Sequence, residues 1–159
     1  YIHLSNNRLS GLSKRMFTNI TYVVVLDLSY NEITNSIQDL IQDLSYRGFD
    51  ILLLKGNHFT GNIPKNLCEL LDLSILDLSH TNFSGAISNC LGKMPFENAL
   101  SLKAALNGFV DVGIHISEKA DFTTTQRSYT YTGDILAYMS GVDLSCNKLN
   151  GSIPSELET

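Results

Sequence analysis

The feature that most constrains this chain is a short pattern, Leu-x-Leu-x-x-Asn-x-Leu with apolar substitutes at the Leu positions. It occurs in five copies: Ile2–Leu9, Leu26–Ile33, Leu52–Phe59, Leu76–Phe83 and Val142–Leu149. Alternation of apolar and other residues predicts a short strand with one buried face in each copy. The Asn lies where the chain must bend, and its amide can satisfy backbone groups that the bend leaves unpaired. The fourth copy has Thr81 in place of this Asn, so we expect a break in the Asn ladder there.

The spacing of the copies predicts an α/β repeat solenoid. Taken at the Asn position, the intervals are 24, 26, 24 and 66 residues. The first three fit the leucine-rich-repeat period of about 20–29 residues, and the last equals one repeat plus an insertion of 42 residues. Because each coil buries its Leu residues only against its neighbours, such a fold is stable as a stack. Neither end carries a capping repeat, so we expect an excerpt of a longer solenoid that is marginally stable alone.

The intervals also divide the chain. We expect leucine-rich repeats over residues 1–91, an island insertion over residues 92–136 and a resumed repeat over residues 137–159. Apolar residues spaced for one helix face predict a short helix in the second coil; they are Ile37, Leu40, Ile41 and Leu44. Within the insertion, the Thr- and Tyr-rich stretch Phe122–Tyr131 favours strand.

A second motif, Leu-Ser/Thr-Gly-x-Ile-Pro, follows most copies. Its occurrences are Leu9–Gly11, Phe59–Pro64, Phe83–Ser88 and Leu149–Pro154. This motif resembles the plant-specific leucine-rich repeat of surface receptor kinases, receptor-like proteins and secreted inhibitors, which implies a right-handed superhelix. The segments Cys68–Leu91 and Phe122–Ser145 further resemble the sequence around the island of plant receptor-like proteins. The resemblance covers essentially the whole chain.

Membership in that family implies a role in recognition. Family members are single-pass plasma-membrane receptors in immune or developmental signalling, and they have no kinase domain. The resemblance therefore implies an extracellular glycoprotein segment that binds a peptide or protein ligand, a co-receptor kinase ectodomain and an adaptor receptor kinase. Its membrane anchor would lie outside this chain. Thr125 stands where many family islands carry a Lys, so that contact has no counterpart here. Alternatives are a secreted inhibitor of a pathogen cell-wall hydrolase and the ectodomain of a receptor kinase.

Candidate binding residues fall on the concave face of the solenoid, between the buried Leu positions. They are Asp27, Tyr30, Lys55, Asp77 and His80. Tyr30 and His80 would be the anchors, because aromatic side chains dominate interface energetics. The alternative is a solvated polar strand face, since Asp-Leu-Ser is common repeat sequence.

Three island residues, Arg127, Tyr129 and Tyr131, are further candidates for partner binding. Their aromatic content argues against disorder, and we expect the island to pack on the concave side with these residues partly exposed. The alternative is that Phe122, Tyr129 and Tyr131 form the island's own small core.

The three cysteines permit one disulfide. Cys68 lies 11 residues after Asn57 and Cys90 lies 9 residues after Thr81, so they occupy similar places on adjacent coils. We expect a disulfide or, alternatively, two buried thiols. Cys146 is expected to be a half-buried free thiol. Asn-x-Ser/Thr triplets begin at Asn19, Asn82 and Asn150, and the resemblance makes these candidate glycosylation sites.

Composition argues against other classes of function. The net charge is −5 with only 17% charged residues, which disfavours nucleic acid as a partner. No apolar run reaches the ~18 residues that a membrane span needs. The sequence has no His-x-x-x-His, Cys-x-x-Cys or Gly-x-Ser-x-Gly motif, so we expect no metal, no cofactor and no enzyme activity. Asp27 and Asp77 share a face, as a glycosidase pair would, but their regular spacing suits the repeat better.

Overall fold

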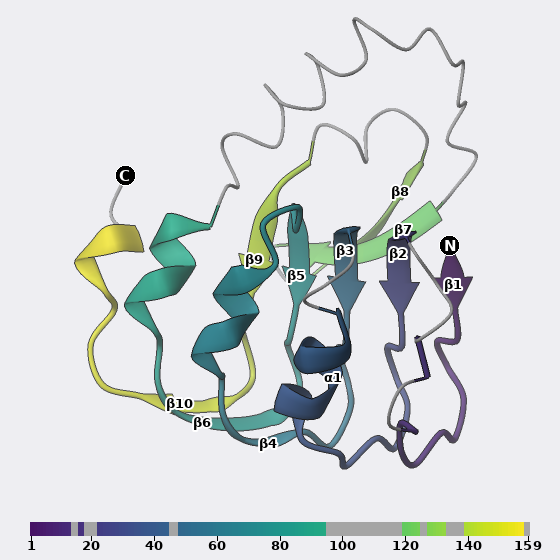
Figure 1. Ribbon diagram of the computed structural model, residues 1–159, viewed down its shortest axis with the longest axis horizontal. Helices are drawn as coiled ribbons and strands as arrows, with labels where there is room; N and C mark the ends of the chain where they lie inside the picture. The colour runs from purple at the N-terminus through teal and green to yellow at the C-terminus, as the bar shows by residue number, and fades with distance from the viewer. Residues whose placement is uncertain are drawn as a thin grey trace, which may run out of the picture.

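The computed structural model shows a stack of coils (Figure 1). It describes residues 1–13, 16–17, 22–44, 48–94, 119–124, 127–132 and 139–157. The island expected over residues 92–136 lies largely outside the described residues. Residues 92 and 93 end the short helix Asn89–Lys93 of the fourth coil, and Met94, which follows it, is buried in the main core.

The main sheet is parallel and has the strand order β1-β2-β3-β5-β9. The strands are β1 (Ile2–His3), β2 (Tyr22–Asp27), β3 (Gly48–Leu53), β5 (Ile75–Asp77) and β9 (Gly141–Asp143). Leu26 pairs with Leu52, Leu52 with Leu76, and Leu76 with Val142, so equivalent positions of the repeat are in register. This confirms the predicted solenoid. Because β9 pairs directly with β5, the fifth coil stacks on the fourth despite the long interval between them.

A second parallel sheet, with the order β10-β6-β4, lies just after the bend of the coils. Its strands are β4 (Thr60–Asn62), β6 (Asn82–Ala86) and β10 (Lys148–Asn150). No strands were predicted here, because each segment is short and contains a glycine or is followed by one. Gly61, Gly85 and Gly151 have φ of +84°, +77° and +86°, a conformation that glycine adopts without steric cost.

The return segments of the second to fifth coils contain helices in the described residues. They form α1 (Ile37–Leu44) and three short 3₁₀ helices, η1 (Lys65–Glu69), η2 (Asn89–Lys93) and η3 (Ser155–Leu157). The predicted helix face in α1 is confirmed, because its four apolar residues are buried. Pro64, which precedes η1, is extended with φ −76° and ψ 146°. The second coil lacks this Ile-Pro motif and is two residues longer than its neighbours, and there a full α-helix forms.

The main core lies between the sheet and the helices, which cover one face in Figure 1. It contains Leu residues from successive coils and a stack of Phe59 on Phe83, with ring centroids 6.0 Å apart and planes at 4°. On the opposite face of the sheet lies an antiparallel hairpin, β7 (Lys119–Thr124) and β8 (Arg127–Thr132). The strand character predicted for Phe122–Tyr131 is therefore confirmed, as parts of two strands.

Candidate functional site

The concave face is the face of the main sheet that is turned away from the helices. One part of it is apolar. Along its first row lie Val25, Ile51 and Ile75, which with Leu53 form a second apolar cluster; Tyr131 and Met139 pack against this cluster. This apolar row was not predicted from the sequence. The signal was present, because the continuous apolar runs Val23–Leu26 and Ile51–Leu54 are typical of strands buried on both faces.

The aspartates of the concave face have a structural task. Oδ1 of Asp27, Asp77 and Asp143 accepts a hydrogen bond from the backbone N–H of Ser29, Ser79 and Ser145, each at 2.9 Å. Such a bond two residues along the chain stabilises the turn that ends each strand. Asp27 is 8% exposed and Asp77 only 1%, so neither side chain forms an open ligand surface.

The position just before the repeat Asn has a left-handed backbone in every copy, and we call these residues the left-handed row. They are Asn6, Tyr30, Gly56, His80 and Cys146, with φ between +52° and +66°. Backbone N–H groups join the row to the next coil, for example from Tyr30 to the Lys55 oxygen at 2.7 Å and from His80 to the Ser145 oxygen at 3.0 Å.

The left-handed backbone exposes the side chains of this row. Tyr30 is 48% exposed, and His80 is also exposed. Cys146 is a free and exposed cysteine, so the expectation of a half-buried thiol was wrong. The row position turns this side chain away from the core, which the alternation of apolar residues alone did not reveal.

Two predicted residues, Tyr30 and Lys55, meet in this row. The Nζ atom of Lys55 lies 5.9 Å from the centroid of the Tyr30 ring, within the range of a cation–π contact. The ring also lies against Gly56, where an added Cβ would come within 2.7 Å of Tyr30 Cδ1. Lys55 is itself only 6% exposed, so the cation–π contact joins the exposed ring to a buried side chain.

Asp77 has an unusual electrostatic environment. Burial, together with the nearby Asp143 charge, raises the pKa of Asp77, while hydrogen bonding from Ser79 and the Lys55 charge oppose the rise. Its second oxygen, Oδ2, and the Ser79 hydroxyl are both buried, and hydrogen bonding from the Ser79 side chain is part of the effect that opposes the rise. Among the described residues, no group of three or more His, Cys, Asp or Glu is arranged to hold a metal ion.

The two candidate tyrosines of the hairpin differ in their exposure. Tyr131 is half-buried against the second apolar cluster, whereas Tyr129 is 40% exposed, and their ring centroids are 6.2 Å apart. Arg127 opens β8 opposite Thr124, and the placement of its side chain lies outside the description. Three Asn-x-Ser/Thr triplets are candidate glycosylation sites. Of their Asn residues, Asn150 is exposed in β10, Asn82 is half-buried in β6, and Asn19 is outside the described residues.

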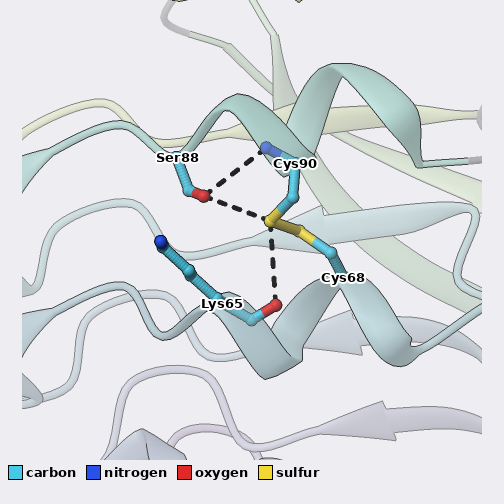
Figure 2. The surroundings of a disulfide bond; sticks show 4 residues. All are labelled: Lys65, Cys68, Ser88 and Cys90. Atoms are coloured by element: carbon cyan, nitrogen blue, oxygen red, sulfur yellow. Dashed lines mark hydrogen bonds between the residues drawn. A yellow bond between two sulfur atoms is a disulfide. The ribbon is translucent and has the colours of Figure 1, made fainter.

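Cys68 and Cys90 form a disulfide between η1 and η2, with Cα atoms 5.9 Å apart (Figure 2). The Ser88 hydroxyl donates to Cys90 Sγ at 3.2 Å and accepts from the Cys90 backbone N–H at 3.4 Å, so it also caps η2. The disulfide therefore links the return segments of the third and fourth coils.

Comparison with known proteins agrees with this geometry. The family model described as Leucine Rich Repeat matches residues 22–44, 72–94 and 140–159. Two Arabidopsis thaliana proteins are similar in sequence. Receptor-like protein 54 is 32% identical over 113 residues, covering 57% of this chain and 14% of that protein. Receptor-like protein 56 is 31% identical over 144 residues, covering 73% of this chain and 15% of that protein.

The chain belongs to the plant leucine-rich-repeat receptor-like proteins. It spans about one seventh of the length of these relatives. Among solved structures, a crystal structure of PEPR1-AtPEP1 superposes with a TM-score of 0.60 at 21% identity, covering 97% of this chain and 16% of that one. The ectodomain of the Arabidopsis thaliana membrane receptor kinase GASSHO1/SCHENGEN3, in complex with Casparian strip integrity factor 2, gives 0.52 at 23% identity, covering 98% and 19%. These likenesses show the fold.

The chain thus has the repeat fold of the two solved receptor structures. No helix in the described ranges is long and apolar enough to cross a bilayer.

Proposed function

We propose that this chain is an extracellular ligand-recognition segment of a plant cell-surface receptor, and that a peptide or protein ligand lies along the left-handed row. The observation that carries this proposal is the Tyr30 ring, which is 48% exposed yet fixed from below by Lys55 and from the side by Gly56. A rigid, half-exposed aromatic ring needs little ordering when it binds, which is the property of interface anchors.

The division of the concave face supports this location. Tyr131 of the hairpin and Met139 already cover the apolar row, whereas the left-handed row remains exposed at Tyr30 and His80. An extended ligand that crosses successive coils would meet one residue of this row about every 4.8 Å. The Tyr30 ring lies over Gly56, so Tyr30 and His80 are the two exposed aromatic side chains of this part of the row.

We further propose that the hairpin contacts a co-receptor kinase ectodomain. Tyr129 is the exposed member of the tyrosine pair, whereas Tyr131 fixes the hairpin on the second apolar cluster. Signalling would pass through that co-receptor and an adaptor receptor kinase at the plasma membrane. No enzyme activity is proposed, because the Asp27 and Asp77 carboxylates are already bonded to turn amides.

The experiment measures binding of a co-receptor kinase ectodomain to the complete receptor ectodomain that contains this chain, with and without a panel of secreted peptides. Tyr30→Ala is expected to abolish the peptide-dependent gain in co-receptor binding, and Tyr129→Ala to weaken co-receptor binding itself. Leu71→Ala is the control, since Leu71 is 72% exposed and lies outside this row. Circular dichroism checks the fold. Unchanged binding by both tyrosine variants with the fold intact would refute the proposal.

A further inference from the structure

Two of the Asn-x-Ser/Thr triplets lie on the second sheet, and their Asn side chains face away from the core. Asn82 belongs to β6 and Asn150 to β10, which are adjacent parallel strands. Phe83 and Leu149, the residues next to them, pack in or against the main core. Because successive side chains of a strand point to opposite sides, Asn82 and Asn150 point outward. Figure 1 shows this sheet at the lower edge of the stack, apart from the hairpin.

The triplet at Asn150 is open to solvent. Asn150, Gly151 and Ser152 are all exposed. The same repeat position in the third coil is Thr60, which has a coil on both sides and is also exposed. The exposure of Asn150 therefore follows from its place in the repeat. An exposed amide at the end of a strand leaves room for a bulky group to be attached.

The triplet at Asn82 is enclosed. Asn82 is half-buried, and its strand β6 is paired with β4 on one side and with β10 on the other. The middle residue of this triplet, Phe83, is 0% exposed and belongs to the main core. The third residue, Ser84, donates its hydroxyl to the Gly61 oxygen at 3.4 Å. A bulky group on Asn82 would therefore have to stand between two paired strands.

We propose that Asn150 carries an N-linked oligosaccharide and that Asn82 does not. The Nδ2 atom of Asn150 forms a bond to the first carbon of the sugar and releases one proton. The oligosaccharide comes from a lipid-linked diphosphate donor, whose sugar–phosphate bond breaks so that the lipid diphosphate leaves. This inference rests on the proposed function, because only a chain that is exported to the cell surface meets that donor.

The oligosaccharide would shield the outer face of the second sheet. Lys148 is exposed on the same side of β10, two residues before Asn150 and roughly 7 Å from it. Ala86 of β6, which is also exposed, is the strand partner of Asn150. A large hydrated group on Asn150 therefore covers Lys148 and Ala86, so protein partners approach the chain from its other faces.

The test expresses the complete receptor ectodomain that contains this chain in plant cells and maps its glycopeptides by mass spectrometry. The peptide with Asn150 is expected to carry the oligosaccharide, and the peptide with Asn82 to be unmodified. Ser152→Ala removes the triplet and should abolish the glycopeptide, whereas Ser152→Thr keeps the hydroxyl and should retain it. Because Ser152 is exposed, neither change should disturb the fold, which circular dichroism checks.

Acetylation of lysine side chains measures the shielding. Lys148 should react more slowly in the wild-type protein than in Ser152→Ala, whereas Lys65, which is exposed on η1, should react equally in both. An unmodified Asn150, equal occupancy of Asn82 and Asn150, or equal reaction of Lys148 in both proteins overturns the inference.

The same mass spectra separate this inference from the proposed function. If other triplets of the ectodomain are modified but Asn150 is not, only the assignment of Asn150 is wrong. If the ectodomain carries no oligosaccharide at all, the proposed extracellular function is wrong as well.

Discussion

The hydroxyl of Thr81 lies 2.6 Å from Oδ1 of Asn147 in the next coil. The other coils have an Asn side chain at the position of Thr81. In the third coil, Asn57 donates to the Leu28 and Leu54 oxygens at 2.9 Å and accepts from the Ile33 N–H at 3.1 Å. Thr81 reaches the Leu78 oxygen of its own coil and Asn147. Neither bond goes to the third coil, so the Asn ladder is interrupted on that side, as the sequence predicts.

Restoring the amide should therefore stabilise the fold. In Thr81→Asn, the amide would reach the Leu54 oxygen and the buried Phe59 N–H, by analogy with Asn57. The expected gain in the free energy of unfolding is about 1 kcal/mol, measured by urea denaturation. The reverse change, Asn57→Thr, should lose about 1–3 kcal/mol, because it leaves buried backbone groups unpaired. A destabilised Thr81→Asn would show that the side chain at this position is limited by space.

The disulfide should make a large contribution to stability. Cys68 and Cys90 close a loop with a sequence separation of 22 residues, and the loss of that cross-link typically costs about 3 kcal/mol. Cys68→Ala/Cys90→Ala should accordingly unfold at lower urea concentration, with the loss centred on η1 and η2 in hydrogen exchange. Cys146→Ala is the control, since this thiol is exposed and free, and its stability should stay within about 0.5 kcal/mol of wild type.

Gly56→Ala should change the binding surface more than the fold. Its Cβ would lie 2.7 Å from Tyr30 Cδ1, so the ring must move away from its position above Lys55. The left-handed backbone adds roughly 1–2 kcal/mol, a strain that Tyr30 and His80 already tolerate at the same position. Peptide-dependent co-receptor binding should fall as it does in Tyr30→Ala, with an unchanged circular dichroism spectrum. Full binding in Gly56→Ala would mean that the ring position is not required.

Asp77 should make stability depend on pH. Its pKa is raised above 3.8 by burial, so the folded chain holds a proton that the unfolded chain has already released. Stability is then greatest below 3.8 and declines as the pH rises through the window up to the native pKa. Asp77→Asn removes this charge and can retain the turn bond to Ser79. The variant should be more stable than wild type at about pH 7, and the difference should vanish at low pH. Urea denaturation across this pH window measures the free energy of unfolding of both proteins. A difference between variant and wild type that does not change with pH would contradict the prediction.

The sequence located many features because the responsible forces are local. The positions of Leu26, Leu52 and Leu76 follow from alternation, and their register follows from the repeat interval. The helix face of α1 follows from apolar spacing in the same way. The partners of Lys55 could not be assigned from its repeat position, because the contact with Tyr30 depends on the side-chain directions of two different coils.

Sequence by itself determined the coil succession, the buried Leu stripe and the turn residues, since each depends on patterns of a few residues. Only the tertiary structure decided that Tyr131 packs against the second apolar cluster while Tyr129 stays exposed. It also decided that Asp77 is only 1% exposed whereas its strand partner Asp143 is half-buried. Burial and charge pairing of these groups depend on which distant segment covers a strand, and that is fixed when the chain returns to the stack.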